Sequence, residues 1–347
     1  MKIAAYTICL NEMKHIDRWL EATSDADLRV IVDTGSQDGT WERLQQKAND
    51  TLQVHQIKVE PFRFDDARNA ALALVPQDID VCVSVDMDEI PQNNFFQTIR
   101  DEWKIGTRIG WHRMHTGPVW NGHRIHSRFG IRWYSPCHEI IDVYGDVEKV
   151  EQTFDIQIDH RPDDSKSRKQ YLQMLEMAVK ENPYDGRMWI YLTREYYFNK
   201  MWSDILESAS AALSIEENWN VEKSYMCRLS VEAAYALNLD PLPFIEEGLK
   251  HDPTSVEMHY TAAYHYYTVK DWKKCYEHSS KRLSLKKTDN YLCENSVWDW
   301  RMYDLMGMSA WYLGMKDKAL KYAQMAVNGN PDDERLVQNL ELIKNGM

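Results

Sequence analysis

Two aspartates, Asp86 and Asp88, are the residues of this chain whose type and spacing point most directly to chemistry. They follow the apolar run 81–85, which is typical of a strand buried on both faces of a parallel sheet. Side chains alternate along a strand, so both carboxylates would point the same way. At a separation of about 4 Å they would repel by roughly 4 kcal/mol near a protein surface. Mg²⁺ or Mn²⁺ would relieve that repulsion and could hold a diphosphate; the alternative is an acidic loop after a strand.

An alternation of strands and helices must position these aspartates. The expected strands are 3–10, 28–33, 52–59 and 81–86, and the expected helices are 11–22, 41–48 and 64–74. Such an alternation predicts a parallel sheet with helices on both faces, whose ligands bind at the carboxyl ends of the strands. Shorter strands are expected at 107–114, 123–133 and 155–159.

The second half of the chain is expected to be helical and repetitive. In its last unit small and aromatic residues fall at tetratricopeptide positions: Tyr303, Met306, Gly307, Ala310, Ala319, Ala323, Ala326 and Pro331. The period of that repeat is about 34 residues, and each helix pair must stack on its neighbours to bury its apolar face. Proline and helix-capping residues at 161–165 predict the boundary, so we expect an α/β domain at 1–164 and an all-α repeat domain at 165–347.

Composition excludes several classes of protein. The 347 residues carry a formal charge of -13, which disfavours non-specific binding to nucleic acid or to an anionic membrane. The six cysteines form no C-x-x-C pair, so we expect free thiols in a reducing compartment and a cytoplasmic protein without a membrane span. The stretch 100–132 is locally basic, which indicates either an anionic ligand or pairing with acids elsewhere in the chain.

An ordered series of motifs extends from the first strand to the domain boundary: 6–12 (YTICLNE), 32–40 (VDTGSQDGT), 64–71 (FDDARNAA), 86–89 (DMDE), 137–141 (CHEII) and 158–160 (IDH). The series resembles the metal-dependent family 2 glycosyltransferases of the GT-A fold, in the branch that carries tetratricopeptide repeats behind the catalytic domain. The resemblance covers essentially the whole chain. It implies a Rossmann-like, mostly parallel sheet followed by the helical repeats, and a nucleotide-sugar donor.

The same resemblance assigns roles to five residues of a donor site. Asp33 would bind the base, flanked by Thr7 and Asn11, although Asp33 could instead cap its own turn. Arg68 would reach a phosphate or the base, with a salt bridge to Asp65 as the alternative. Asp86 would contact the ribose or the metal.

The metal ligands implied by the resemblance are Asp86, Asp88 and His160, because a neutral imidazole suits Mn²⁺. Inverting transfer also needs a carboxylate that takes the proton of the acceptor. Glu139 is the candidate for this base, and Asp142 and Glu89 are its rivals.

The leading expectation is therefore an enzyme, an inverting glycosyltransferase that uses Mn²⁺ or Mg²⁺ and a nucleotide-sugar, with a UDP-sugar favoured. The acceptor stays open between a saccharide, a lipid-linked glycan, a protein side chain and a hydroxymethylated base of DNA. The repeats would bind an acceptor or a second subunit, giving a homodimer. The alternative is a non-catalytic scaffold, with a degenerate transferase domain and protein-binding repeats. A nucleotidyltransferase is disfavoured because no Gly-rich loop follows the first strand.

Overall fold

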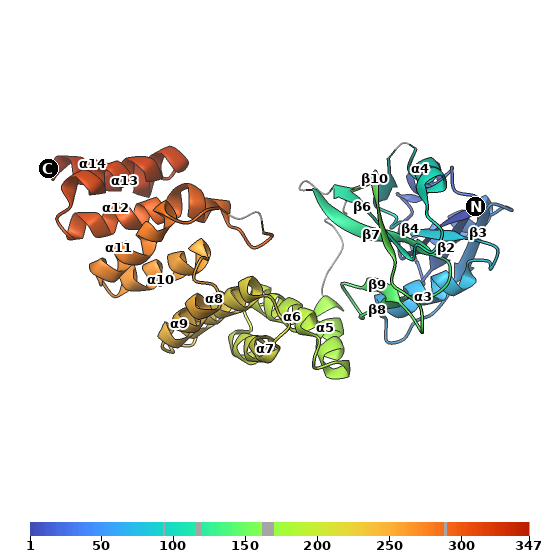
Figure 1. Ribbon diagram of the computed structural model, residues 1–347, viewed down its shortest axis with the longest axis horizontal. Helices are drawn as coiled ribbons and strands as arrows, with labels where there is room; N and C mark the ends of the chain where they lie inside the picture. Colours follow the sequence, from blue (N-terminus) through green and yellow to red (C-terminus); the bar gives the residue numbers. More distant parts are fainter. Residues whose placement is uncertain (93, 116–118, 162–169, 288–289, 347) are drawn as a thin grey trace. The chain divides into compact units, whose positions relative to one another are not determined.

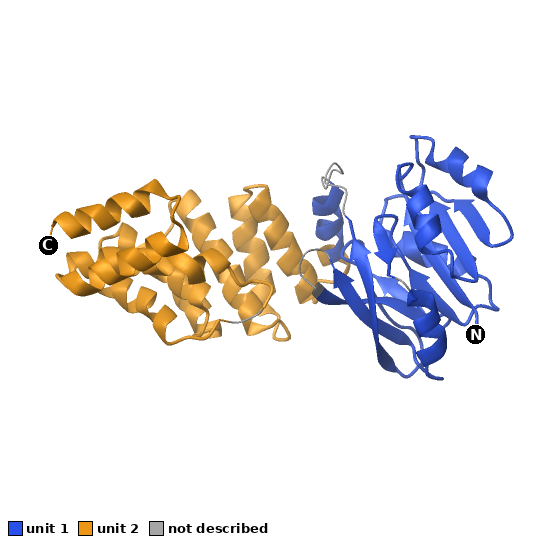
Figure 2. Cartoon of the chain, turned by 90° about the horizontal axis from the view of Figure 1, so that it is seen from above, with its two compact units in different colours: residues 1–178 blue, residues 179–347 orange. Residues whose placement is uncertain are grey.

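The computed structural model describes residues 1–347 except 93, 116–118, 162–169, 288–289 and 347. The chain divides into two compact units, Met1–Ala178 and Val179–Met347 (Figures 1 and 2). The expected boundary at 164/165 lies outside the described residues. Each unit has its own core and is described by itself.

The first unit contains an eight-stranded mixed sheet in the order β3-β2-β1-β4-β7-β6-β10-β5. Its first four strands in that order are mutually parallel: β3 (Leu52–Gln56), β2 (Leu28–Asp33), β1 (Ile3–Cys9) and β4 (Val81–Ser84). The remaining strands of the sheet are β7 (Val119–Ser127), β6 (Ile109–His115), β10 (Glu151–His160) and β5 (Glu89–Pro91). β7 runs antiparallel to β4 and to β6, and β5 runs antiparallel to β10. The predicted parallel arrangement therefore holds for β1–β4, whereas the whole sheet is mixed.

Helices cover both faces of this sheet, because the strands bury side chains on both sides. In β1 the buried side chains of Ile3 and Ala5 belong to one apolar cluster, and those of Ala4 and Tyr6 belong to another. The first cluster includes residues of α1 (Ile16–Ala22), α2 (Thr40–Lys47) and α4 (Phe95–Glu102). The second includes residues of α3 (Phe64–Leu74) and of a separate two-stranded sheet, β8 (Ile131–Tyr134) with β9 (Ile140–Val143).

Two local expectations differ from the structure for reasons of backbone conformation. The single strand expected at 123–133 is divided between β7 and β8, because Gly130 turns the chain at a φ of 76°. The helix expected from Asn11 begins at Ile16, because Asn11 itself is left-handed with a φ of 57°. Asparagine tolerates that conformation better than most residues.

The second unit consists of helix pairs, which confirms the predicted helical repeats. The pairs are α6 (Gly186–Phe198) with α7 (Trp202–Ser214), α8 (Asn220–Ala236) with α9 (Leu242–His251), α10 (Val256–Thr268) with α11 (Trp272–Ser280), and α12 (Met302–Tyr312) with α13 (Lys316–Gly329). Helix α14 (Glu334–Asn345) packs on the last pair as predicted, and α5 (Gln170–Glu181) precedes the first. Between α11 and α12 lie a 3-10 turn, η1 (Lys281–Leu283), and a π-helical turn, η2 (Val297–Arg301).

Small residues set the spacing within the last pair. A side chain at Gly307 would place its Cβ 3.0 Å from the backbone nitrogen of Ala323 in the facing helix. The predicted repeat positions Ala310 and Ala319 are completely buried. Within the described residues, no helix has the length and apolarity that crossing a membrane requires.

Candidate functional site

The cluster of polar side chains at the carboxyl end of β4 centres on Arg68 of α3. Its guanidinium donates from Nε to Glu139 Oε1 at 2.6 Å, and from Nη1 and Nη2 to the two oxygens of Asp86 at 2.7 and 3.1 Å. Nη1 also donates to Ser84 Oγ at 3.1 Å. Arg68 is only 4% exposed, so these acceptors replace the water that the guanidinium loses. The structure thus brings together three of the predicted site residues, Arg68, Asp86 and Glu139.

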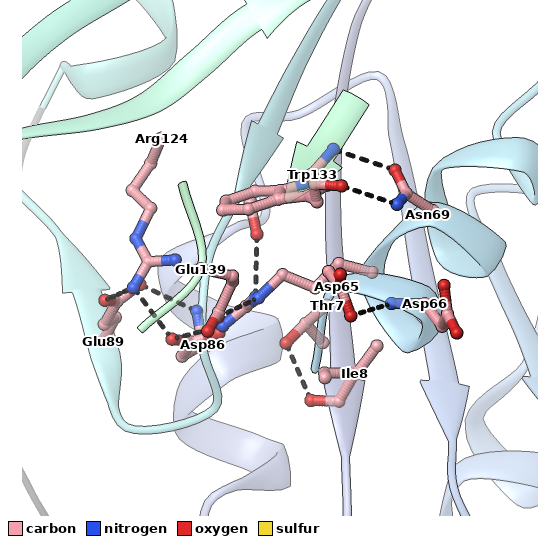
Figure 3. Close-up of polar contacts among 12 residues, drawn as sticks. Thr7, Ile8, Asp65, Asp66, Asn69, Asp86, Glu89, Arg124, Trp133 and Glu139 are labelled. Carbon is pink, nitrogen blue, oxygen red and sulfur yellow. Dashed lines mark hydrogen bonds and ion pairs between the residues drawn. The ribbon is translucent and has the colours of Figure 1, made fainter. Parts of the chain in front are cut away.

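A second guanidinium, that of Arg124 on β7, completes this arginine–carboxylate cluster (Figure 3). Arg124 Nη2 donates to Asp86 Oδ2 and to Glu89 Oε1, both at 3.1 Å. The buried ring of Trp133 lies 5.0 Å from the guanidinium carbon of Arg68 and 5.9 Å from that of Arg124. Cation–π contacts of this kind stabilise a desolvated guanidinium. Trp133 is fixed in turn by two backbone hydrogen bonds to Asn69 and by an indole N–H donated to Tyr6 Oη.

The charges of the cluster are balanced internally. Burial alone would raise the pKa of Asp86, but Arg68 and Arg124 outweigh burial and hold that pKa well below its usual range. Burial raises the pKa of Glu89 to about 7, against the opposing pull of Arg124. The pKa of Arg68 lies well above its ordinary value, because Asp86 and Glu139 outweigh its burial. Two guanidinium groups therefore face two ionised carboxylates and one that exchanges its proton near neutral pH.

The predicted base-binding residues have partners within their own loops. Oδ1 of the buried Asp33 accepts hydrogen bonds from the backbone N–H groups of Gly35 and Ser36 at 2.9 and 3.0 Å, and from Gln56 Nε2 at 3.0 Å. These bonds overcome burial and lower the pKa of Asp33. The hydroxyl of Thr7 donates to the carbonyl of Ile8 at 3.1 Å. Asp33 thus caps its own turn, the alternative that its sequence context allowed.

Asn11 lies at the same end of the sheet, where it joins two loops. Its backbone N–H donates to Ser36 Oγ at 2.7 Å, and its side-chain Oδ1 accepts from the backbone of Gln37 at 2.8 Å. It therefore holds the loop after β1 against the loop after β2.

The three predicted metal ligands are divided between two sets of partners. Asp86 faces Arg68 and Arg124, whereas Asp88 pairs with His160 at 3.4 Å between Oδ2 and Nε2. That hydrogen bond raises the pKa of His160, against the effect of burial. Among the residues that the structure describes, no three His, Cys, Asp or Glu side chains are grouped so that they could hold a metal ion. The donor set does not fit Mn²⁺ or Mg²⁺ in this arrangement, because both oxygens of Asp86 accept from guanidinium groups.

Arg124 and Trp133 are members of the cluster that motif reasoning missed, although Arg124 lies in the basic stretch noted in the sequence. Other arginines of that stretch also pair with the chain itself. Arg100 contacts Asp27 at 2.9 Å, and Arg113 contacts Asp155 at 2.7 Å. For these arginines pairing with acids elsewhere, rather than an external anion, accounts for the local excess of positive charge.

A different set of aromatic and basic side chains lies on the repeats. Tyr191 and Arg194 on α6 recur as Tyr225 and Arg228 on α8, 34 residues later, which is the repeat period. In both helices the tyrosine and arginine are three positions apart, so they share one helix face. Their guanidinium carbons lie 5.9 and 5.5 Å from the ring centres. Tyr260 of α10 and Arg301 of η2 form a comparable contact at 5.8 Å. We refer to these six residues as the tyrosine–arginine face.

A pocket of about 410 Å³ adjoins this face, within the second unit. Tyr225 and Arg228 line it, together with Glu257 of α10 and residues of the segment 290–298. Both aromatic and charged groups therefore line this hollow.

Comparisons with known proteins match the helical half of the chain only. No family model matches the sequence, and no curated protein does. Solved structures that resemble it include MamA (15% identity, TM-score 0.37), covering 47% of this chain and 89% of that one. A TPR protein of Thermus thermophilus is 17% identical with a TM-score of 0.36, over 50% of this chain and 88% of that one. YrrB, described as a TPR protein with an unusual peptide-binding site, is 11% identical with a TM-score of 0.37, over 49% and 81%.

The expected resemblance to family 2 glycosyltransferases is wrong by these comparisons, and so is the expected inverting transfer from a UDP-sugar. The neighbours are repeat proteins, and none of those described above is a glycosyltransferase. The physical reason lies in what a motif series can establish. The acids and the arginine occur at the expected spacings, but Arg68 and Arg124 neutralise Asp86, the residue expected to serve the donor and its metal.

Proposed function

We propose that this protein is a scaffold whose helical repeats bind a polypeptide segment of another protein. The observation that carries the proposal is the tyrosine–arginine face, in which a Tyr-x-x-Arg pair recurs at the repeat period on α6 and α8. Tyrosine and arginine are enriched where proteins bind one another, because each combines a large apolar or planar contact area with directional hydrogen bonding.

The first unit supports the non-catalytic part of this proposal. Its buried arginine–carboxylate cluster links α3, β4, β7 and the loop at Glu139 through charge-assisted hydrogen bonds. Such a network is satisfied without a ligand, so its role here is to join the ends of these elements. The N-terminal domain then serves as a folded platform for the repeats.

A peptide-display selection on the full chain tests the binding function. We expect the protein to enrich a consistent peptide motif, and we expect an Arg194→Gln/Arg228→Gln variant to lose that enrichment while keeping its helical circular dichroism. Lys250→Gln, on an exposed side chain of α9, is the matched control. Failure to enrich any motif, or equal enrichment by the double variant, would contradict the proposal.

A thermal-shift experiment tests the absence of transfer chemistry. Binding of UDP with Mn²⁺ at a hundred times its dissociation constant would stabilise the protein by about 2.7 kcal/mol. We expect no stabilisation by UDP, with Mn²⁺ or Mg²⁺ or with a chelator. Metal-dependent stabilisation would contradict the scaffold and restore an enzyme. A homodimer through the repeats stays a prediction, which sedimentation of the full chain at two concentrations tests.

A further inference from the structure

The segment between η1 and η2 lies against the tyrosine–arginine face. The carboxylate of Glu294 accepts a hydrogen bond from Arg228 Nη2, and its Oε2 lies 3.7 Å from Arg301 Nη1. The backbone N–H of Glu294 donates to Glu257 Oε1 at 3.0 Å. Tyr291, three residues earlier, donates its hydroxyl to Glu222 Oε1 on α8 at 2.5 Å. Thus a carboxylate and an aromatic ring of the chain itself occupy this face.

The contacts of this segment leave binding capacity unused. Arg228 meets Glu294 through Nη2 alone, and its buried Nε has no hydrogen-bond partner. A guanidinium binds a carboxylate most strongly through two parallel hydrogen bonds. Tyr291 remains 59% exposed, so its ring is only partly covered by the face. A better-placed carboxylate could therefore form a stronger pair with Arg228 than Glu294 does.

We infer that residues 290–294 are an internal substitute for the ligand, and that the ligand is an acidic peptide segment carrying an aromatic residue near its carboxylate. This inference rests on the proposed function and names its partner chemistry. The incoming carboxylate replaces Glu294 between Arg228 and Arg301, and its aromatic side chain replaces Tyr291. Because the internal segment is tethered, it competes at a high effective concentration. The wild-type protein accordingly binds such a peptide weakly until the internal contact is broken.

The test uses a fluorescent synthetic peptide with the sequence of residues 290–297, in which serine replaces Cys293. Its binding to the full-length protein is measured by fluorescence anisotropy. We expect Glu294→Gln to bind the peptide about tenfold to a hundredfold more tightly than wild type, because loss of a charged hydrogen bond releases the internal competitor. The same peptide with glutamine in place of its glutamate should bind Glu294→Gln more weakly by a similar factor.

Two further variants separate this inference from general effects. Arg228→Gln in the Glu294→Gln background should lose the gain in affinity, whereas Lys250→Gln in that background should keep it. Tyr291→Phe breaks the hydroxyl contact without changing a charge, so it gives a second way to release the segment if Glu294→Gln folds poorly. Equal affinity of all variants, or no binding to either released variant, would overturn the inference. A peptide selection that enriches only basic or proline-rich sequences would overturn it while leaving the scaffold in place, and a selection without any motif would remove both.

Discussion

The guanidinium of Arg68 is held at the residue scale by acceptors alone, since Asp86, Glu139 and Ser84 surround it. The transfer of such an ion out of water costs several kcal/mol, and close pairing offsets this cost only while every partner is present. The cluster is consequently more sensitive to the loss of one member than to replacement of the whole set.

Replacing Arg68 by methionine should therefore destabilise the first unit strongly. Removal of one partner from a buried ion pair typically costs about 3–5 kcal/mol, because it leaves uncompensated carboxylates behind. Arg113→Met is the matched control, since Arg113 and its partner Asp155 are both largely exposed. An exposed pair contributes about 0–1 kcal/mol. Urea unfolding followed by tryptophan fluorescence measures both variants, and equal losses of stability would show that the cluster contributes no more than a surface pair.

Sequence reasoning located part of this cluster. The apolar run 81–85 indicated that Asp86 follows a buried strand, and the motif series included Arg68 and Glu139, which meet as neighbours. It did not find Arg124 as the second partner, because β7 enters the sheet antiparallel beside β4 and no local pattern specifies that pairing. Which acids an arginine neutralises depends on such long-range pairing, so ligand roles could not be derived from spacing alone.

At the scale of elements, a pair of histidines joins α10 to α11. Nε2 of the buried His259 lies 3.1 Å from the carbonyl oxygen of Pro253, to which it can only donate. Its Nδ1 then accepts from Nδ1 of His278 at 3.1 Å, which requires a neutral ring. Burial lowers the pKa of His259 to about 4 and also lowers the pKa of His278.

Acid should accordingly weaken the second unit. A histidine whose pKa is lower in the folded than in the unfolded state contributes stability above pH 6.5 that is lost as the pH falls toward 4. For His259 the loss is on the order of 3 kcal/mol. The free energy of unfolding should therefore depend less on pH in His259→Asn than in wild type over this window. Urea unfolding at pH 7.5, 6, 5 and 4 measures the difference between the two slopes, and parallel slopes would refute this role for His259.

The order of elements followed from hydrophobic periodicity more reliably than their pairing did. The alternation of apolar strands and helices predicted β1–β4 and α1–α3, since both faces of those strands are buried. The later strands were less accessible to this reasoning. A change of strand direction, as at β7, leaves no periodic signal, and the φ of Gly130 that separates β7 from β8 shows itself only as one glycine in the sequence.

The whole molecule contains separate apolar cores. Within the described residues, the clusters of buried apolar side chains in the sheet unit draw on residues 3–158. Those in the repeat unit draw on residues 190–343. Cooperative unfolding follows shared apolar packing, so each unit should respond to the loss of its own core contacts.

Two matched core substitutions test this separation in the intact chain. Ile31 in β2 and Ile205 in α7 are both fully buried, and replacing either by alanine should cost about 2–5 kcal/mol. We expect Ile31→Ala to raise amide hydrogen exchange only in the strands and helices of the first unit, and Ile205→Ala only in the helix pairs of the second. Mass spectrometry of the exchanged full-length protein locates the change. If either substitution raised exchange equally in both units, the two cores would unfold as one, and a partner bound to the repeats would then also stabilise the arginine–carboxylate cluster.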